Sequence, residues 1–170
     1  MTNHFELFGL APSFALDAGA LERAFRELQS RVHPDRFAQA GDAERRASMQ
    51  WSTRANEAYR MLKDPVQRAR YLLELHGVDT GFETDTRMPA DFLARQIELR
   101  EALEEAKEMQ DPTALDAMKR DLAVSSRALE AELASCIDGA QDYAGAASAV
   151  RRLQFLRRLS EEVEAAYDFE

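Results

Sequence analysis

The chain has 170 residues, 45% of them hydrophobic and 31% charged, with a formal net charge of −9 at pH 7. This composition predicts one large or two small soluble globular domains. No run of 18 apolar residues is present, and the start of the chain at residues 1–4 lacks the basic and then apolar pattern of a signal peptide, so we expect a cytoplasmic protein. The single cysteine, Cys136, excludes an internal disulfide and a CxxC metal site.

The charge is divided unevenly along the chain. Residues 1–78 contain 11 Lys and Arg against 10 Asp and Glu, a net charge of +1, whereas residues 79–170 contain 11 against 21, a net charge of −10. An acidic second half repels nucleic acid and anionic membranes, so we expect neither as a partner. The simplest interpretation is that the two halves bind different partners.

An amphipathic helix is predicted to end near residue 33. Its apolar residues recur at i, i+4, i+7 and i+11, which is the spacing of one helical face. Proline cannot continue a helix and disfavours the α conformation in the residue before it, so Pro34 predicts a turn. A second amphipathic segment follows, with four predicted buried positions. The first face comprises Leu21, Phe25, Leu28 and Val32, and the second Trp51, Ala55, Ala58 and Leu62.

The tripeptide His33-Pro34-Asp35 lies in the predicted turn. Two antiparallel helices joined there would form a rigid hairpin whose tip presents an imidazole and a carboxylate to a partner. A three-residue pattern also arises by chance in turns, so the tripeptide alone does not decide the function.

Three more helices are predicted after a break. Residues 76–89 contain two glycines and a proline, which indicates a turn or linker. The next helix is expected from about Pro89 to Gln110. Asp111 and Pro112 then form an N-cap and a first helical position. Short connections predict an antiparallel three-helix bundle, and no segment reads as a strand, so the fold class is all-α. The second helix, ending near 138–139, carries Leu115, Met118, Leu122, Leu129 and Leu133; the third, from about Asp142, carries Val150, Leu153, Leu156 and Val163.

The helix that begins near residue 90 has two different faces. At 100° per residue, one stripe is apolar and predicts core. The opposite side places aliphatic residues among carboxylates, which favours a docking surface with apolar anchors and acidic selectivity for a basic partner. Exposed single aliphatics and solvated glutamate runs are also normal, so both readings stay open here. The core stripe is Phe92, Leu99, Leu103 and Ala106; the docking side is Leu93, Ala94, Ile97, Glu98, Glu101 and Glu105, flanked by Phe155.

The first 75 residues or so resemble a J domain, the module by which co-chaperones stimulate DnaK-type ATPases. The resemblance rests on the tripeptide at 33–35 and on four flanking segments. These are FELFGL at 5–10, NEAY at 56–59, LKDP at 62–65, and Arg68, Ala69 and Tyr71.

The chain as a whole resembles the HscB family, co-chaperones of bacterial iron–sulfur cluster assembly. The residues that carry this resemblance are YLLELHG at 71–77, the segment from Phe92-Leu93 to Leu99-Arg100-Glu101, RRLQFL at 151–156 and YDF at 167–169. The resemblance implies a J domain over 1–76 packed on a C-terminal three-helix bundle over 89–170, with a linker over 77–88.

The family also implies the partners and the residues that bind them. The bundle would bind the cluster scaffold IscU through Leu93, Ala94, Ile97, Glu98, Glu101, Glu105 and Phe155. His33, Pro34 and Asp35, with Arg26, Arg31 and Arg36, would contact the ATPase chaperone HscA. This chain departs from the family pattern at Ala94, where a larger apolar residue is expected. It also departs from general J proteins at Glu22 and Glu27, which interrupt their basic surface; this second departure favours one dedicated chaperone.

Three alternatives remain for the function. A general J-domain co-chaperone with another client is the nearest. A hydrolase using His33 and Asp35 with Cys136 is disfavoured, because no nucleophile motif surrounds Cys136, which we expect to be a small buried residue. A purely structural helical protein is the third. We expect no enzymatic activity, no cofactor and no metal, since a single cysteine cannot hold an iron–sulfur cluster and no phosphate-binding glycine loop is present.

Overall fold

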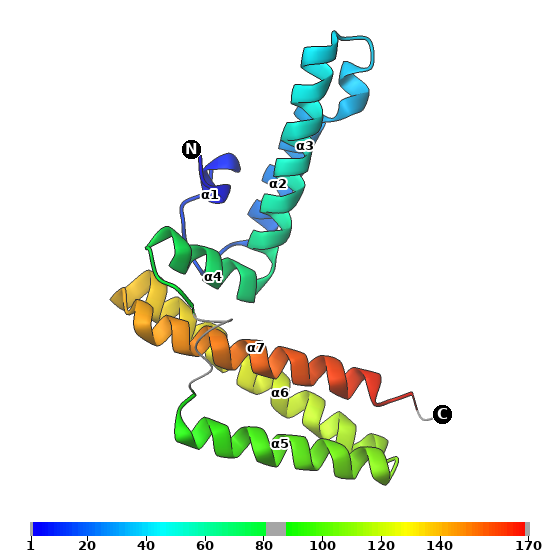
Figure 1. Cartoon of the computed structure of the whole chain (residues 1–170), viewed down its shortest axis with the longest axis vertical. Coiled ribbons are helices and arrows are strands. Elements are labelled where there is room, and N and C mark those ends of the chain that lie inside the picture. Colours follow the sequence, from blue (N-terminus) through cyan, green and yellow to red (C-terminus); the bar gives the residue numbers. More distant parts are fainter. Residues whose placement is uncertain (1, 81–87, 169–170) are drawn as a thin grey trace. The chain divides into compact units, whose positions relative to one another are not determined.

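The computed structural model describes residues 2–80 and 88–168. These residues form seven α-helices and two short helical segments and contain no strand, so the all-α prediction is confirmed (Figure 1). The helices are α1 (His4–Leu7), α2 (Ala18–Val32), α3 (Asp42–Lys63), α4 (Pro65–Leu75), α5 (Ala90–Glu108), α6 (Pro112–Ala134) and α7 (Tyr143–Ala165); η1 (Pro34–Phe37) is a 3₁₀ turn and η2 (Ser135–Ala140) a π-helical turn.

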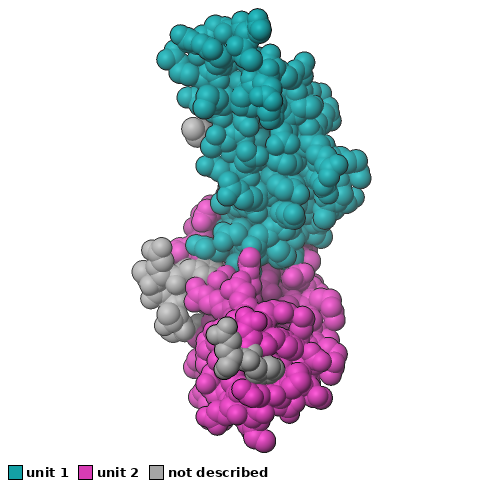
Figure 2. All heavy atoms as spheres, turned by 90° about the vertical axis from the view of Figure 1, so that its right-hand side faces the viewer, with its two compact units in different colours: residues 1–72 teal, residues 73–170 magenta. Residues whose placement is uncertain are grey.

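The chain divides into two compact units, residues 1–72 (unit 1) and 73–170 (unit 2), which Figure 2 shows in separate colours. The division falls inside α4. Most of the predicted linker, residues 81–87 of the range 77–88, lies outside the described residues. The division into residues 1–76, 77–88 and 89–170 therefore stays a prediction.

Helices α2 and α3 form the predicted hairpin of unit 1 (Figure 1). Helix α2 begins after Asp17, whose carboxylate accepts hydrogen bonds from the backbone N–H groups of Gly19 and Ala20 at 2.9 and 3.1 Å. It ends at Val32, two residues before Pro34, as the proline requires. Between the helices the rings of Phe25 and Tyr59 stack with their centroids 4.2 Å apart.

The base of the hairpin is closed by the short helix α1 and by the start of α4. Phe5 of α1 is completely buried. Asp64 caps α4 through hydrogen bonds from the backbone N–H groups of Val66 and Gln67. Arg68 then donates to the carbonyl oxygens of Phe14 and Leu62, both at 2.8 Å. These bonds hold the loop before α2 against the end of α3, and they account for the LKDP and Arg68 part of the sequence pattern.

The prediction of a buried core position is wrong for one residue of α3. Ala55, Ala58 and Leu62 are buried as expected, but the side chain of Trp51 is 44% exposed. A two-helix hairpin covers only one strip of each helix, and a large indole extends beyond that strip. The guanidinium of Arg54 lies 5.4 Å from the centre of the indole ring and covers part of it.

The buried polar residue of the hairpin is Ser48, which is 4% exposed. Its hydroxyl donates to the carbonyl oxygen of Val32 at 2.6 Å. That carbonyl belongs to the last turn of α2, where no intrahelical partner is available. The hydrogen bond therefore joins the two helices immediately before the turn at residues 33–35.

Unit 2 is the predicted three-helix bundle, with α5, α6 and α7 running in alternating directions (Figure 1). Asp111 caps α6 by accepting from the backbone N–H groups of Thr113 and Ala114, and Pro112 is the first helical residue, as predicted. Helix α6 continues through the π-helical turn to Ala140, and Gln141 then takes a left-handed conformation with φ of 54°. All the core residues predicted for α6 and α7 are buried, as are Leu99, Leu103 and Ala106 of α5, while Phe92 is half-buried.

Replacing Ser48 by alanine should lower the free energy of unfolding by about 1–2 kcal/mol, because the Val32 carbonyl loses its partner. Chemical denaturation followed by circular dichroism measures this change. Ser52→Ala on the same helix is the control, since the Ser52 hydroxyl has no hydrogen bond among the described residues; it should change the stability by less than about 0.5 kcal/mol. Equal losses in both variants would contradict the assignment.

Candidate functional site

The turn at the hairpin tip exposes the imidazole and the carboxylate of the tripeptide. His33 is both the last cap of α2 and the N-cap of the 3₁₀ turn, and its Nδ1 accepts a hydrogen bond from the backbone N–H of Asp35 at 3.2 Å. Pro34 is the first residue of that turn. The side chains of His33 and Asp35 are 47% and 91% exposed. The imidazole of His33 thus orders the tip, and the Asp35 carboxylate, whose Oδ2 lies 3.5 Å from Nδ1 of His33, remains exposed to a partner.

Two further hydrogen bonds hold this tip. Ser48 binds the carbonyl of Val32 from α3, and the guanidinium of Arg36 donates to the carbonyl oxygen of Ser30 at 2.9 Å. Arg36 therefore caps the C-terminus of α2, besides being exposed. Sequence reasoning did not identify Ser48, because a polar residue adds nothing to the apolar periodicity by which the buried face of α3 was predicted. The available clue was that Ser48 falls on the same predicted face of α3 as Ala55 and Leu62, where a polar side chain needs a hydrogen-bond partner.

The arginines on α2 are exposed and already paired within the helix. Arg26 forms an ion pair with Glu22 at 2.6 Å, and Arg31 pairs with Glu27. Exposed i,i+4 pairs of this kind contribute only a few tenths of a kcal/mol, so a partner's carboxylate can replace the glutamate at little cost. The glutamates that interrupt the basic surface in sequence are thus the residues that pair with these arginines.

Helix α5 has the two faces that its sequence predicts. Leu99, Leu103 and Ala106 are buried, whereas Leu93 and Ile97 are 44% and 61% exposed. Ala94 is exposed beside them. We call the exposed residues Leu93, Ala94, Ile97, Glu98, Glu101 and Glu105 of α5, together with the half-buried Phe155 of α7, the α5 face. Helix α5 thus exposes two large aliphatic side chains to solvent on a side away from its buried stripe.

The carboxylates of the α5 face are not equivalent. Glu98 forms an ion pair with Arg95 at 3.1 Å. Glu101 and Glu105 are exposed and have no ion pair within the part of the chain that the structure describes. These two carboxylates are therefore the ones most available to a basic partner.

Phe155 of α7 is half-buried and is held on two sides. Its ring meets that of Phe92 edge-to-face, with the centroids 5.7 Å apart. The guanidinium of Arg100 lies 5.6 Å from the centre of the Phe155 ring. Phe155 thus joins α7 to α5 and is partly accessible beside it.

Cys136, the third residue of the hydrolase alternative, is not an activated nucleophile. Cys136 is half-buried rather than buried, and burial, followed by the carboxylates of Asp142 and Glu132, raises the pKa of its thiol. An activated thiol nucleophile needs the opposite shift. Residues 2–80 and 88–168 contain no group of three or more side chains placed to hold a metal ion. Within the same residues no helix is long and apolar enough to span a membrane.

The chain is similar over nearly its full length to known co-chaperones. Residues 88–164 match the model of the HscB C-terminal oligomerisation domain. The co-chaperone protein HscB homolog of Burkholderia thailandensis is 52% identical over 163 residues, which cover 96% of this chain and 93% of that protein. The homologues of this chain are thus named co-chaperones, a class of proteins that are not themselves enzymes.

Solved structures agree with this relationship. Chaperone HscB from Vibrio cholerae is 39% identical, with 98% of each chain covered and a TM-score of 0.85. Human co-chaperone HscB is 28% identical, with 96% of this chain and 81% of that chain covered and a TM-score of 0.90. The helical hairpin of unit 1 is accordingly a J domain, and the chain belongs to the HscB family of co-chaperones.

Proposed function

We propose that this chain is a cytoplasmic, non-catalytic adaptor that stimulates the ATPase of a dedicated DnaK-type chaperone, HscA. It would deliver the scaffold IscU to that chaperone during iron–sulfur cluster assembly and transfer. The observation that carries the proposal is the presence, in one chain, of an ordered and exposed His33-Pro34-Asp35 tip and an exposed aliphatic face on α5. Under this proposal residues 1–76 are the J domain and 89–170 bind the scaffold.

The tip acts on the chaperone by binding. Asp35 accepts a charge-assisted hydrogen bond from a cationic side chain of HscA, because its carboxylate is open and its backbone is already engaged with His33. Arg26 and Arg31 on the exposed side of α2, with Arg36 next to the tripeptide, would add contacts to acidic groups of the chaperone. The tip accelerates hydrolysis only if it binds the hydrolysis-competent conformation of the chaperone more tightly than the others. No proton transfer by His33 is needed.

The α5 face holds the scaffold. Leu93, Ile97 and Phe155 supply apolar contact area, which gives most of the affinity of such interfaces. Glu101 and Glu105 attract a basic surface and orient it before contact. When both partners are bound to one chain, the scaffold is presented to the chaperone at a high effective concentration, and hydrolysis then traps it.

Asp35→Asn should reduce the stimulation of HscA ATPase at least about tenfold, because the charge-assisted hydrogen bond is lost. His33→Gln should have a similar effect by removing the ring that orders the turn. Single-turnover ATP hydrolysis measures both. Glu44→Gln, an exposed carboxylate on α3 with no ion pair among the described residues, is the control and should stimulate normally. Full stimulation by Asp35→Asn would favour a purely structural protein.

The double variant Leu93→Ala, Ile97→Ala should bind IscU at least about tenfold more weakly, since two partly exposed anchors each lose about 1 kcal/mol or more of contact. Isothermal titration calorimetry gives the affinity. Val124→Ala is the matched control, because Val124 is 59% exposed on α6 but not part of the α5 face. Unchanged affinity in the double variant would contradict the docking face and favour another client.

Neutralising Glu101 and Glu105 to glutamine should slow association with IscU and flatten its dependence on salt, because these carboxylates attract the partner over a distance. Stopped-flow binding at several ionic strengths measures both quantities. The control variant Glu44→Gln, Glu57→Gln makes the same change of net charge in unit 1. An equal effect of the two double variants would assign the attraction to net charge alone.

A further inference from the structure

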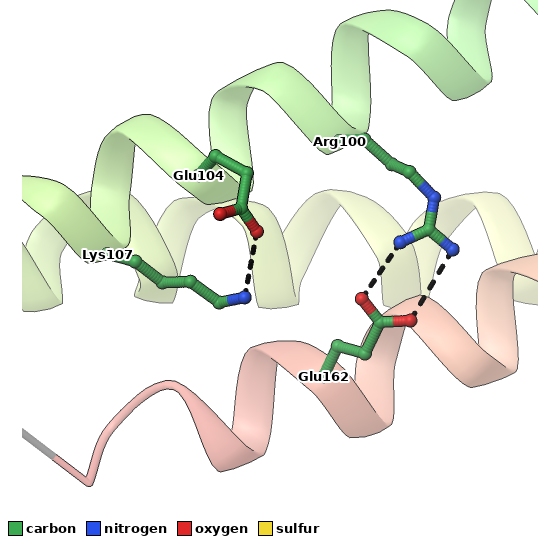
Figure 3. Close-up of polar contacts among 4 residues, drawn as sticks. All are labelled: Arg100, Glu104, Lys107 and Glu162. Carbon is green, nitrogen blue, oxygen red and sulfur yellow. Dashed lines mark hydrogen bonds and ion pairs between the residues drawn. The ribbon is translucent and has the colours of Figure 1, made fainter.

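Helices α5 and α7 are joined by a two-pronged ion pair next to the α5 face. The guanidinium of Arg100 donates from Nη1 to Oε2 of Glu162 at 2.9 Å and from Nη2 to Oε1 at 3.4 Å (Figure 3). Arg100 follows Leu93 and Ile97 at the i+7 and i+3 positions, so it lies on the same side of α5. The ion pair therefore ends the apolar row that the partner would contact.

The other ion pairs of α5 do not reach α7. Arg95 pairs with Glu98, and Lys107 pairs with Glu104 within α5 itself, as Figure 3 shows for the second pair. Within the described residues, Arg100–Glu162 is thus the ion pair that connects α5 to α7. A planar guanidinium suits this position, since it can bind a carboxylate with two nitrogens while its face lies against an aromatic ring.

The same guanidinium also contacts Phe155. It lies 5.6 Å from the centre of the ring, whose other contact is the edge-to-face pair with Phe92. Glu162 and Phe155 are seven residues apart, so both lie on the side of α7 that meets α5. Arg100, Glu162 and Phe155 form one connected cluster, which we call the α5–α7 clasp.

We infer that Arg100 and Glu162 are positioning residues for scaffold binding: they hold Phe155 against α5, where its ring contacts Phe92, so that the apolar surface is formed before the partner arrives. This inference rests on the proposed function. A surface formed in advance binds more tightly, because fewer side chains must be ordered on association. Glu162 never needs to touch the partner for this effect.

A direct contact between Arg100 and the partner makes a different prediction. If the guanidinium bound the scaffold itself, Glu162→Ala would free it and leave the affinity unchanged or raised. If Arg100 acts through the clasp, the affinity should fall by about the same factor in Arg100→Ala, in Glu162→Ala and in the double variant. We expect a loss of about fivefold, which is the order expected when one more side chain must be ordered on binding.

The experiment uses the full chain and purified IscU in isothermal titration calorimetry. In a Phe155→Ala background, Arg100→Ala should cause no further loss. A second readout is the NMR signal of the Phe155 ring in the unbound protein, which should shift and broaden in Arg100→Ala and in Glu162→Ala. Lys119→Ala is the control, because it breaks another ion pair between helices, Lys119–Glu164, away from Phe155; it should alter neither readout.

The outcomes separate this inference from the proposed function. Weak binding by Leu93→Ala, Ile97→Ala together with normal binding by Glu162→Ala would overturn the clasp and leave the docking face intact. Additive losses from Arg100→Ala and Glu162→Ala, or a full Arg100→Ala effect in the Phe155→Ala background, would also overturn it. Absence of IscU binding by the unaltered chain would instead remove the proposed function.

Discussion

Much of unit 1 follows from the inability of Pro34 to continue a helix. Helix α2 has to stop at Val32, and the carbonyl groups of its last turn then need other partners. Ser48 takes one of them from α3, and Arg36 takes that of Ser30 from just beyond the turn. The same stop allows His33 to cap the 3₁₀ turn with its imidazole. One steric constraint thus gives a tip whose backbone is fixed and whose carboxylate is exposed.

Unit 2 also presents exposed side chains on a fixed backbone, here on a helix of the bundle instead of a turn. Helix α5 needs only the stripe of Leu99, Leu103 and Ala106 to be buried, which leaves its opposite side free to carry Leu93 and Ile97. In both units, contacts that stabilise the fold leave nearby side chains exposed to a partner. The family relationship to co-chaperones agrees with two surfaces that are exposed to partners.

The sequence predicted well wherever a regular period determines burial. The core of α6 and α7, the capping by Asp111 and Pro112, the end of α2 and the two faces of α5 are all as expected, because they depend on residues close in sequence. The prediction that Trp51 is buried was wrong, since helical spacing does not show how much of an indole side chain two helices can cover. Ser48, Glu162 and the second contact of Arg100 were not predicted, because each depends on residues 16 to 62 positions away.

In the proposed function, the tip and the α5 face act together in one chain. Single-turnover ATP hydrolysis by HscA, measured with this chain and IscU separately and then together, tests it most directly. The combined acceleration should exceed the product of the two separate ones, since the chain brings the scaffold and the J domain to the same chaperone. A combined acceleration no greater than that product would contradict it.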